Sequence, residues 1–194
     1  MDQKYWDQRW MCGDTGWDIG YPAPAILDYA AGLPDKTIRI LIPGCGNAYE
    51  AQALLDMGFK DVHLLDISPT LTDRLKERFQ PWSGHIHIHC EDFFEHQGSY
   101  HLILEQTFLC ALNPSQREAY AQKCQQLLYA GGRLAGLLFD TIFEQEGPPF
   151  GGTAMEYRAL FGKYFRILKL EKCLLSIPQR QGREVFFEVE KIGP

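Results

Sequence analysis

The order of strand-like and helix-like segments predicts an α/β fold, a mostly parallel sheet with helices on both faces. Short apolar runs typical of buried strands alternate with segments whose apolar residues recur at helical spacing. A glycine-rich turn, Pro43-Gly44-Cys45-Gly46, separates the first of these runs from the helix after it. Ligands of such sheets bind at the carboxyl ends of the strands, so the residues directly after each strand are the candidates for a site.

The first half of the chain contains two strand–helix units and a third strand. The expected strands are residues 38–42, 62–66 and 85–90, and the expected helices are residues 48–57 and 69–79. Gly58 is a plausible cap at the end of the first helix. Ser68 precedes Pro69, which is a common pair of residues at the start of a helix. His and Ile alternate in the third strand, as expected for a strand with two different faces.

The second half continues the pattern and ends in two strands. The expected strands are residues 100–104, 133–139, 167–175 and 184–192. Asn113 and Pro114 open a helix that is expected to end before Gly131, and Thr153 with Glu156 forms a capping-box pattern for a helix to about Tyr164. Residues 180–182 could turn a hairpin between the last two strands.

Composition is that of an ordinary globular domain. The chain has 194 residues, 45% hydrophobic and 23% charged, with a net charge of -6. We expect a single domain over residues 1–194, with no nucleic-acid partner because no basic run appears, and no membrane partner because no long apolar stretch appears. The six cysteines form no C-x-x-C pair and the N-terminus lacks a signal peptide, which favours the cytoplasm.

Three consecutive strands end in residues that suit an adenosine group. Gly44 and Gly46 follow the first strand and let a ligand approach the backbone closely. Asp66 ends the second strand, where a carboxylate can accept two hydrogen bonds from ribose hydroxyls. Asp92 and Phe93 follow the third, where they can accept from an adenine amino group and pack on its ring. Together these residues predict an adenosine site without yet choosing the cofactor.

A nicotinamide dinucleotide is the rival cofactor. Its fingerprint requires a third glycine three residues after the second, because the pyrophosphate needs close packing at the start of the helix. Tyr49 stands at that position here. S-adenosylmethionine has no phosphate and does not need this glycine, so the turn favours it.

Several segments together resemble a known family. They are Trp6-x-x-x-Trp10, Gly13-Asp14-Thr15-x-Trp17-Asp18, Ile42-Pro43-Gly44-Cys45-Gly46, Leu65-Asp66-Ile67-Ser68, Glu91-Asp92-Phe93-Phe94, Thr107-Phe108-Leu109-Cys110-Ala111-Leu112 and Gly147-Pro148-Pro149-Phe150. The chain resembles the thiopurine S-methyltransferase superfamily from Trp6 to about Ile192, most closely its branch of halide/thiol methyltransferases and their bacterial relatives. The resemblance implies a Rossmann-like class I methyltransferase fold, with a seven-stranded, mostly parallel sheet whose last strand is antiparallel.

The same resemblance implies S-adenosyl-L-methionine as cofactor and a lid formed by the N-terminal segment, about residues 1–32. Trp6, Trp10 and Trp17 would close over the cofactor, and Trp17 would also border the substrate. Trp6 and Trp10 share one face of a helix at i and i+4. Aromatic faces attract a sulfonium cation as they attract ammonium.

Further site residues come from the resemblance alone. It implies cofactor contacts for Gly44, Asp66, Asp92 and Phe93, and for the pair after the fourth strand, here Glu105 and Gln106. The halide/thiol branch usually has Asp followed by an aromatic residue at this pair, so Gln106 makes the expected substrate pocket more polar. Arg117 matches an arginine near the substrate of the thiopurine branch and could attract an anionic nucleophile.

His85, His87 and His89 share one strand face, but we expect no metal site there. Same-face positions on a single strand seldom close a tetrahedral site, and no cysteine or carboxylate is obviously added.

The expected function is methyl transfer from S-adenosylmethionine to a small soft nucleophile, a thiol or hydrosulfide. A thiol with a pKa of about 8.5 is partly ionised at neutral pH and needs little help from a base, so no catalytic base is assigned. The alternatives are a halide or an aromatic thiol as acceptor. More remote alternatives are a nicotinamide-dependent oxidoreductase and a non-catalytic cofactor-binding protein.

Overall fold

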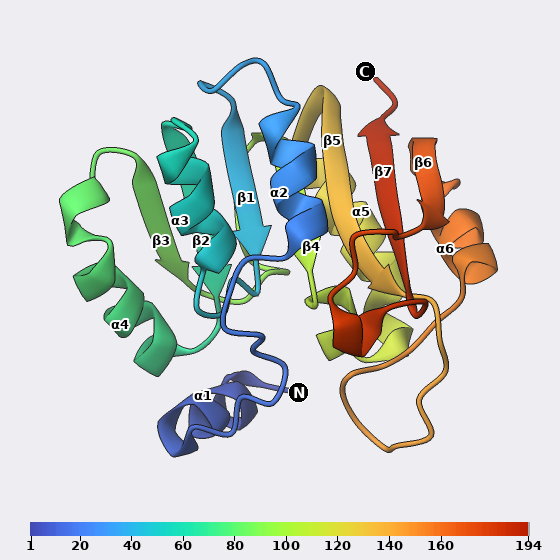
Figure 1. Cartoon of the computed structure of the whole chain (residues 1–194), viewed down its shortest axis with the longest axis horizontal. Coiled ribbons are helices and arrows are strands. Elements are labelled where there is room, and N and C mark those ends of the chain that lie inside the picture. The colour runs from blue at the N-terminus through green and yellow to red at the C-terminus, as the bar shows by residue number, and fades with distance from the viewer. Residues whose placement is uncertain (194) are drawn as a thin grey trace.

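A seven-stranded sheet forms the centre of the computed structural model, which describes residues 1–193 (Figure 1). Its strands are β1 (Arg39–Pro43), β2 (Asp61–Asp66), β3 (Ile86–Cys90), β4 (Tyr100–Gln106), β5 (Leu128–Phe139), β6 (Phe165–Lys172) and β7 (Glu184–Lys191). The spatial order is β3-β2-β1-β4-β5-β7-β6. Strands β1 to β5 are parallel, whereas β7 is antiparallel to both β5 and β6. The predicted fold class and the antiparallel last strand are confirmed.

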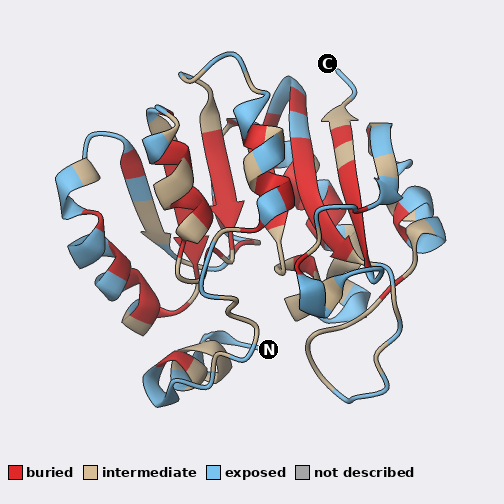
Figure 2. Ribbon diagram, viewed as in Figure 1, coloured by how far each residue is buried: buried red, intermediate tan, exposed pale blue. Residues whose placement is uncertain are grey.

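Helices cover both faces of the sheet, because the strands carry apolar residues on both sides. The helices are α1 (Gln3–Cys12), α2 (Pro24–Ala31), α3 (Tyr49–Asp56), α4 (Pro69–Arg78), α5 (Arg117–Leu127) and α6 (Ala154–Phe161). One core lies between the sheet and α2, α3 and α4, and includes Ile40 and Leu64. The other lies under α5 and α6 and includes Leu41 and Leu65. Figure 2 shows the central strands as the most deeply buried part of the molecule.

The predicted helix starts agree with the structure. The Ser68 side chain accepts a hydrogen bond from the backbone N–H of Leu71 at 3.2 Å, with Pro69 as the first residue of α4. Thr153 and Glu156 form the expected capping box of α6. These caps satisfy backbone N–H groups that have no partner within the helix.

The expected start of the fifth strand at residue 133 differs from the structure. Helix α5 ends at Leu127, and β5 begins at Leu128 and contains Gly131 and Gly132. The two glycines lie beside an irregularity in the β4–β5 register, and a Cβ on Gly132 would lie 2.9 Å from the carbonyl oxygen of Tyr129. They therefore belong to a bulged strand and do not end the helix.

The connection from β6 to β7 also differs from the expected hairpin turn. Residues 173–183 form a longer link that contains a short 3-10 helix, Pro178–Arg180. Helix α2 was not expected; it begins with Pro24 and packs against α3 in the first core.

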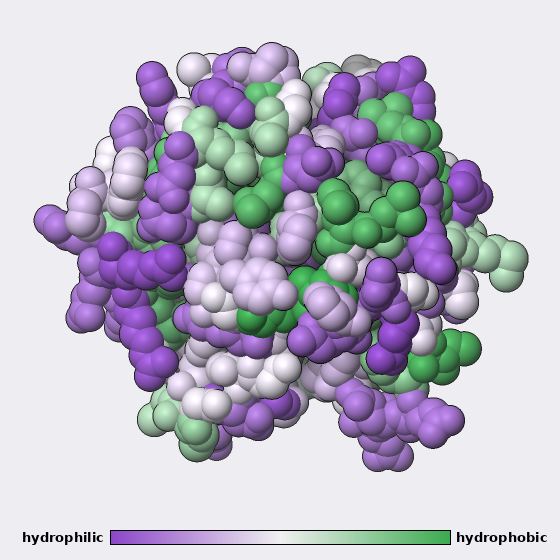
Figure 3. Space-filling model, in the orientation of Figure 1, coloured by the Kyte–Doolittle hydropathy of each residue, from purple (hydrophilic) through white to green (hydrophobic). Residues whose placement is uncertain are grey.

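The face of the molecule drawn in Figure 3 is mainly hydrophilic. On this face, apolar side chains form small patches between hydrophilic ones. Among residues 1–193, no helix is both long and apolar enough to span a bilayer.

Candidate active site

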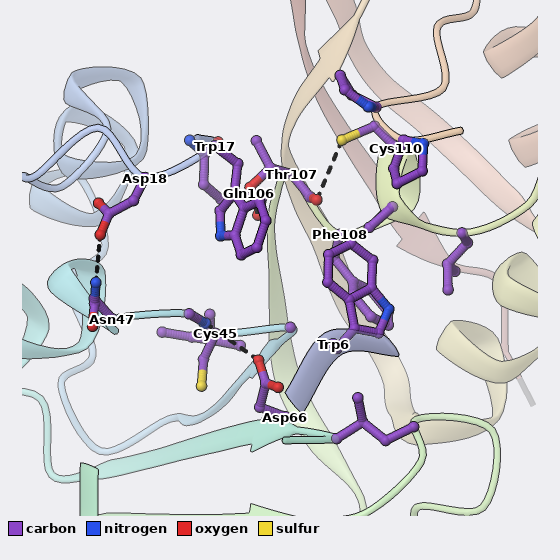
Figure 4. A pocket seen from close by; sticks show the side chains of 18 of the residues that line it. Trp6, Trp17, Asp18, Cys45, Asn47, Asp66, Gln106, Thr107, Phe108 and Cys110 are labelled. Carbon is purple, nitrogen blue, oxygen red and sulfur yellow. Dashed lines mark hydrogen bonds between the residues drawn. The ribbon is translucent and has the colours of Figure 1, made fainter. Parts of the chain in front are cut away.

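A cavity of about 550 Å³ lies at the carboxyl ends of the parallel strands, under α1 (Figures 1 and 4). Its wall combines the ends of β1, β2, β3 and β4 with the N-terminal segment, the loop after β5 and the link before β7. Nine of the predicted site residues line it: Trp6, Trp10, Trp17, Gly44, Gly46, Asp66, Asp92, Phe93 and Gln106. The chain therefore brings together, at one edge of the sheet, residues that lie up to 100 positions apart in sequence.

The turn after β1 forms the floor of the cavity. Gly44 and Gly46 have φ angles of 57° and 51°, in the left-handed region that favours glycine. A Cβ on Gly44 would lie 2.3 Å from the Phe108 ring, so a larger residue would displace that ring. Burial raises the pKa of the Cys45 thiol between these glycines well above its usual value. This thiol packs as a small apolar group in the core under α2, α3 and α4.

Asp66 ends β2 and points into the cavity (Figure 4). One carboxylate oxygen accepts the backbone N–H of Ser68 at 3.0 Å, and the other receives only a long contact of 3.5 Å from the N–H of Gly46. Burial raises the pKa of this carboxyl from 3.8 to about 6. The carboxylate can therefore accept further hydrogen bonds from a ligand. Those bonds would replace the ones to water that are lost on burial.

The turn after β3 supplies an exposed carboxylate beside a buried ring. The Asp92 side chain accepts the backbone N–H of Phe94 at 2.8 Å and stays open to the cavity. Phe93 is 4% exposed and packs edge-on against Phe108, with ring centroids 5.1 Å apart. The turn thus offers one polar and one apolar contact to a planar group.

The side chains of the last two residues of β4, Glu105 and Gln106, point in different directions. Gln106 lines the cavity, and its side-chain oxygen is buried without a hydrogen-bond partner among the described residues. Glu105 is 1% exposed and lies outside the cavity wall. Its carboxylate accepts the backbone N–H groups of Phe108 and Leu109 and the hydroxyl of Tyr120 at 2.6–3.0 Å. The expected cofactor contact of the Glu105 side chain is therefore corrected: this side chain shapes the turn after β4.

Three tryptophan side chains close the cavity from the N-terminal side. Trp6 and Trp10 lie one turn apart on α1, and each meets Trp17 edge-to-face, at 5.5 and 5.7 Å between ring centroids. The Arg9 guanidinium lies 4.8 Å from the Trp17 ring centre on the same wall. Figure 4 shows Trp6 and Trp17 beside the cavity. Edge-to-face contacts of this kind hold each ring in a defined orientation.

Hydrogen bonds fasten the N-terminal segment over the sheet. Asp7 on α1 accepts from the Ser68 hydroxyl at 2.6 Å and from the backbone N–H of Thr70 at 2.9 Å. Asp18 accepts from the side chain of Asn47 in the floor turn. These bonds join the segment to the start of α4 and to the turn after β1, so its position depends on both.

Two arginines border the end of the cavity that lies near β5 and β7. Arg180 donates to the carbonyl oxygen of Trp17 at 3.1 Å and lies 5.4 Å from the Phe139 ring centre. Arg183 lies 5.1 Å from the ring centre of Phe143. Both arginines and both rings line the cavity. We call this group of four side chains the arginine–phenylalanine end of the cavity.

Arg117 does not line this cavity, so its expected place near the substrate stays a prediction. It donates to the carbonyl oxygen of Gly151 at 2.5 Å, and its guanidinium lies 5.9 Å from the Tyr157 ring centre. Arg117 therefore holds the loop between β5 and α6 in place.

The place of Arg180 and Arg183 before an antiparallel last strand could have identified them as cavity residues. The sequence analysis interpreted this segment only as a hairpin turn. An antiparallel last strand begins at the same edge where parallel strands end. Residues directly before β7 consequently lie beside the cavity, as the residues after β1 to β4 do.

The chain is similar to known methyltransferases over nearly its whole length. The family model described as thiopurine S-methyltransferase matches residues 1–191. A probable thiol methyltransferase 2 of Arabidopsis thaliana is 35% identical over 92% of this chain and 81% of its own, and thiocyanate methyltransferase 1 of Brassica oleracea is 28% identical over 100% and 87%. The crystal structure of Burkholderia thailandensis 1,6-didemethyltoxoflavin-N1-methyltransferase, solved with bound S-adenosylhomocysteine, shares the fold with a TM-score of 0.79 at 15% identity, over 98% of this chain and 87% of that one. The chain belongs to the thiopurine S-methyltransferase family of S-adenosylmethionine-dependent methyltransferases.

Proposed function

We propose that this methyltransferase acts on a small anionic sulfur nucleophile, a thiolate or hydrosulfide, held at the arginine–phenylalanine end of the cavity. The observation that carries this proposal is the pairing of Arg180 and Arg183 with the faces of Phe139 and Phe143. Guanidinium groups favour an anion, while the apolar ring surfaces beside them disfavour one that is strongly hydrated. A thiolate meets both conditions. Named relatives that act on thiols and on thiocyanate support the same choice.

The remaining cavity wall fits S-adenosylmethionine. Asp66 is a buried carboxylate with acceptor capacity left over, and it suits the ribose hydroxyls. Asp92 and Phe93 suit the adenine ring. The unpartnered side-chain oxygen of Gln106 suits a donor such as the ammonium of the methionine part. Trp6 and Trp17 border the space left for the sulfonium.

S-adenosylmethionine supplies an already activated methyl group when bound, so the protein has little proton chemistry to perform. The tryptophans exclude water, and the arginines hold the nucleophile in the anionic form and in line with the methyl carbon. Asp18 and Glu105 are both engaged in hydrogen bonds that fix backbone or lid positions. Neither is needed as a base for a nucleophile that is already ionised.

Replacement of Arg183 tests the acceptor end directly. Arg183→Gln should lower kcat/KM for a thiol several-fold and leave the affinity for S-adenosylmethionine nearly unchanged, because the lost charge faces the acceptor. Arg158→Gln on α6 is the matched control, since Arg158 is exposed and outside the cavity. Equal loss in both variants, or a loss of cofactor affinity alone in Arg183→Gln, would show that this end does not hold the nucleophile.

A further inference from the structure

One face of the sheet is not covered by a helix at its β2–β3 edge. Val62, Leu64 and Ile86 on the opposite face belong to the core under α2, α3 and α4. On the α5 side, the chain between β3 and β4 forms no helix over residues 91–99. Polar side chains cover this part of the sheet instead, and β3 shows partly exposed positions (Figure 2).

Two histidines and a glutamate meet on this uncovered face. His89 lies on β3, Glu91 directly follows that strand, and His96 lies in the link to β4. The Nδ1 atom of His96 lies 2.6 Å from Oε1 of Glu91, and Nδ1 of His89 lies 3.9 Å from the same oxygen. One ligand atom from each residue can be chosen so that all three lie within 4.8 Å of one another.

The second nitrogen of each ring is held by a partner on the protein. Nε2 of His96 lies 2.7 Å from the buried hydroxyl of Tyr100. Nε2 of His89 lies 2.9 Å from Nδ1 of His63, whose Nε2 lies 2.9 Å from Oδ1 of Asp61. Metal-binding histidines usually have an outer partner on the second ring nitrogen. An ion bound at Nδ1 of His89 and His96 would require the tautomers that carry hydrogen on Nε2, which would then donate to Nδ1 of His63 and to the Tyr100 hydroxyl.

We propose that His89, Glu91 and His96 form a binding site for a divalent transition-metal ion of the zinc class, separate from methyl transfer. Imidazole and carboxylate ligands suit zinc at bond lengths of about 2.0–2.2 Å, which separate neighbouring ligand atoms by roughly 3.4 Å. The observed separations from Oε1 of Glu91 are 2.6 and 3.9 Å, so small side-chain shifts would bring the three ligand atoms to the spacing of one ion. The Glu91 side chain is 42% exposed, so an ion can enter and water can complete its coordination.

The proposed site contains ligands that β3 alone does not offer. His85, His87 and His89 offer no carboxylate among themselves, which is why the sequence favoured no metal. The structure adds Glu91 and the buried His96 from beyond the strand. Glu91 directly precedes Asp92, and both border the cavity. An ion bound to Glu91 would therefore also fix the turn that carries Asp92.

The neighbouring triad of Asp61, His63 and His87 is a poorer site. The Arg39 side chain lies against it, with Nε 2.9 Å from Nε2 of His63 and 3.7 Å from the Asp61 carboxylate. A fixed guanidinium at this position repels a second cation. Of these three residues, only His63 holds a ring nitrogen of His89.

Metal titration of the purified full-length protein, stripped with a chelator, tests the proposal. The probes are Zn²⁺, measured by competition with a chromophoric chelator, and Co²⁺, measured by its visible absorption. Wild-type protein should bind one equivalent, with the Co²⁺ spectrum of a nitrogen and oxygen site and no thiolate charge-transfer band. His89→Gln and Glu91→Gln should each weaken binding at least about tenfold, and Tyr100→Phe should weaken it by about 10–100-fold as a lost outer hydrogen bond.

His87→Gln is the matched control, because it removes a histidine of the same strand face from the rejected triad. Its affinity should equal that of the wild type within about twofold, whereas thermal unfolding should show every variant folded. If His87→Gln loses the ion and His89→Gln keeps it, the ion lies at the other triad and the proposal is wrong. Equal binding in all variants, or a thiolate band that traces the ion to the exposed Cys12 or Cys90, would also overturn it.

Discussion

Asp66 is the residue on which cofactor affinity should depend most. Its carboxylate is buried at the end of β2, with one oxygen held only by a long contact. Asp66→Ala should weaken S-adenosylmethionine binding by about 1–3 kcal/mol, roughly 5- to 150-fold, because the ribose hydroxyls would lose their acceptors. Calorimetry measures this change, and Asp56→Ala on the exposed side of α3 is the matched control. Unchanged affinity in folded Asp66→Ala protein would remove this residue from the site.

The pKa of Asp66 predicts a pH dependence of its own. Burial raises this pKa from 3.8 to about 6, so the folded protein holds the proton more tightly than the unfolded chain does. The free energy of unfolding should therefore fall as pH rises between these values, by roughly 3 kcal/mol, and the full cost is present above pH 6.

Cofactor binding should show the opposite trend, because the carboxylate is the form that accepts the hydroxyls. The affinity for S-adenosylmethionine should decrease as pH falls below about 6. Asp66→Asn cannot ionise, so its affinity should be weaker but flatter with pH over the same range. Calorimetry on both proteins between pH 5 and pH 8, about the range in which this group titrates, makes the comparison. Parallel pH profiles would show that another group controls binding.

At the scale of single residues, the sequence predicts which residues lie at the strand ends better than it predicts where their side chains point. Gly44, Asp66 and Asp92 follow from the rule that ligands bind at the carboxyl edge. Glu105 stands at an equivalent place, yet its carboxylate turns inward to bind two backbone N–H groups and Tyr120. The direction of a side chain depends on partners such as Tyr120 that lie far away in the sequence.

Among the elements, the N-terminal segment should act as the lid of the cavity. Its tryptophans border the cavity, and its hydrogen bonds to α4 and to the floor turn hold it there. Deletion of residues 1–20 should leave a folded sheet that binds S-adenosylmethionine poorly, because water would enter and the aromatic contacts would be lost. The bond from the backbone N–H of Ala23 to Glu50, 2.9 Å long, remains in the truncated chain and anchors its new end.

Binding and turnover of the truncated protein test this prediction, with circular dichroism as the check on folding. Normal turnover without residues 1–20 would contradict the lid. A chain that binds the cofactor normally but turns over slowly would limit the role of the segment to the acceptor.

Element boundaries were harder to predict than element types. Gly131 and Gly132 are typical helix terminators, but here they lie within the bulged start of β5. Helix α2 was not predicted because Ala23 precedes it, so it lacks the capping side chain that marks the starts of α4 and α6. In both cases tertiary packing decides the local structure.

For the whole molecule, strand order assembles the two ends of the cavity. The parallel strands β1 to β4 bring together the residues that suit the cofactor, while antiparallel β7 returns Arg180 and Arg183 to the same edge. Sequence patterns predicted the first group directly. The reversed last strand was expected from the family resemblance, but the second group also depends on the long link before β7, which replaces the expected hairpin turn.

The most direct test of the proposed activity compares nucleophiles at saturating S-adenosylmethionine across pH. Methylated product should form faster from a small thiol or hydrosulfide than from iodide. The thiol rate should rise with pH until the thiolate saturates, near a pKa of about 8.5 or below it if the arginines lower that value, while the iodide rate stays flat. An aromatic thiol that is turned over faster than every small thiol would place the acceptor among larger thiols. Iodide turned over faster than every thiol tested would contradict the proposal.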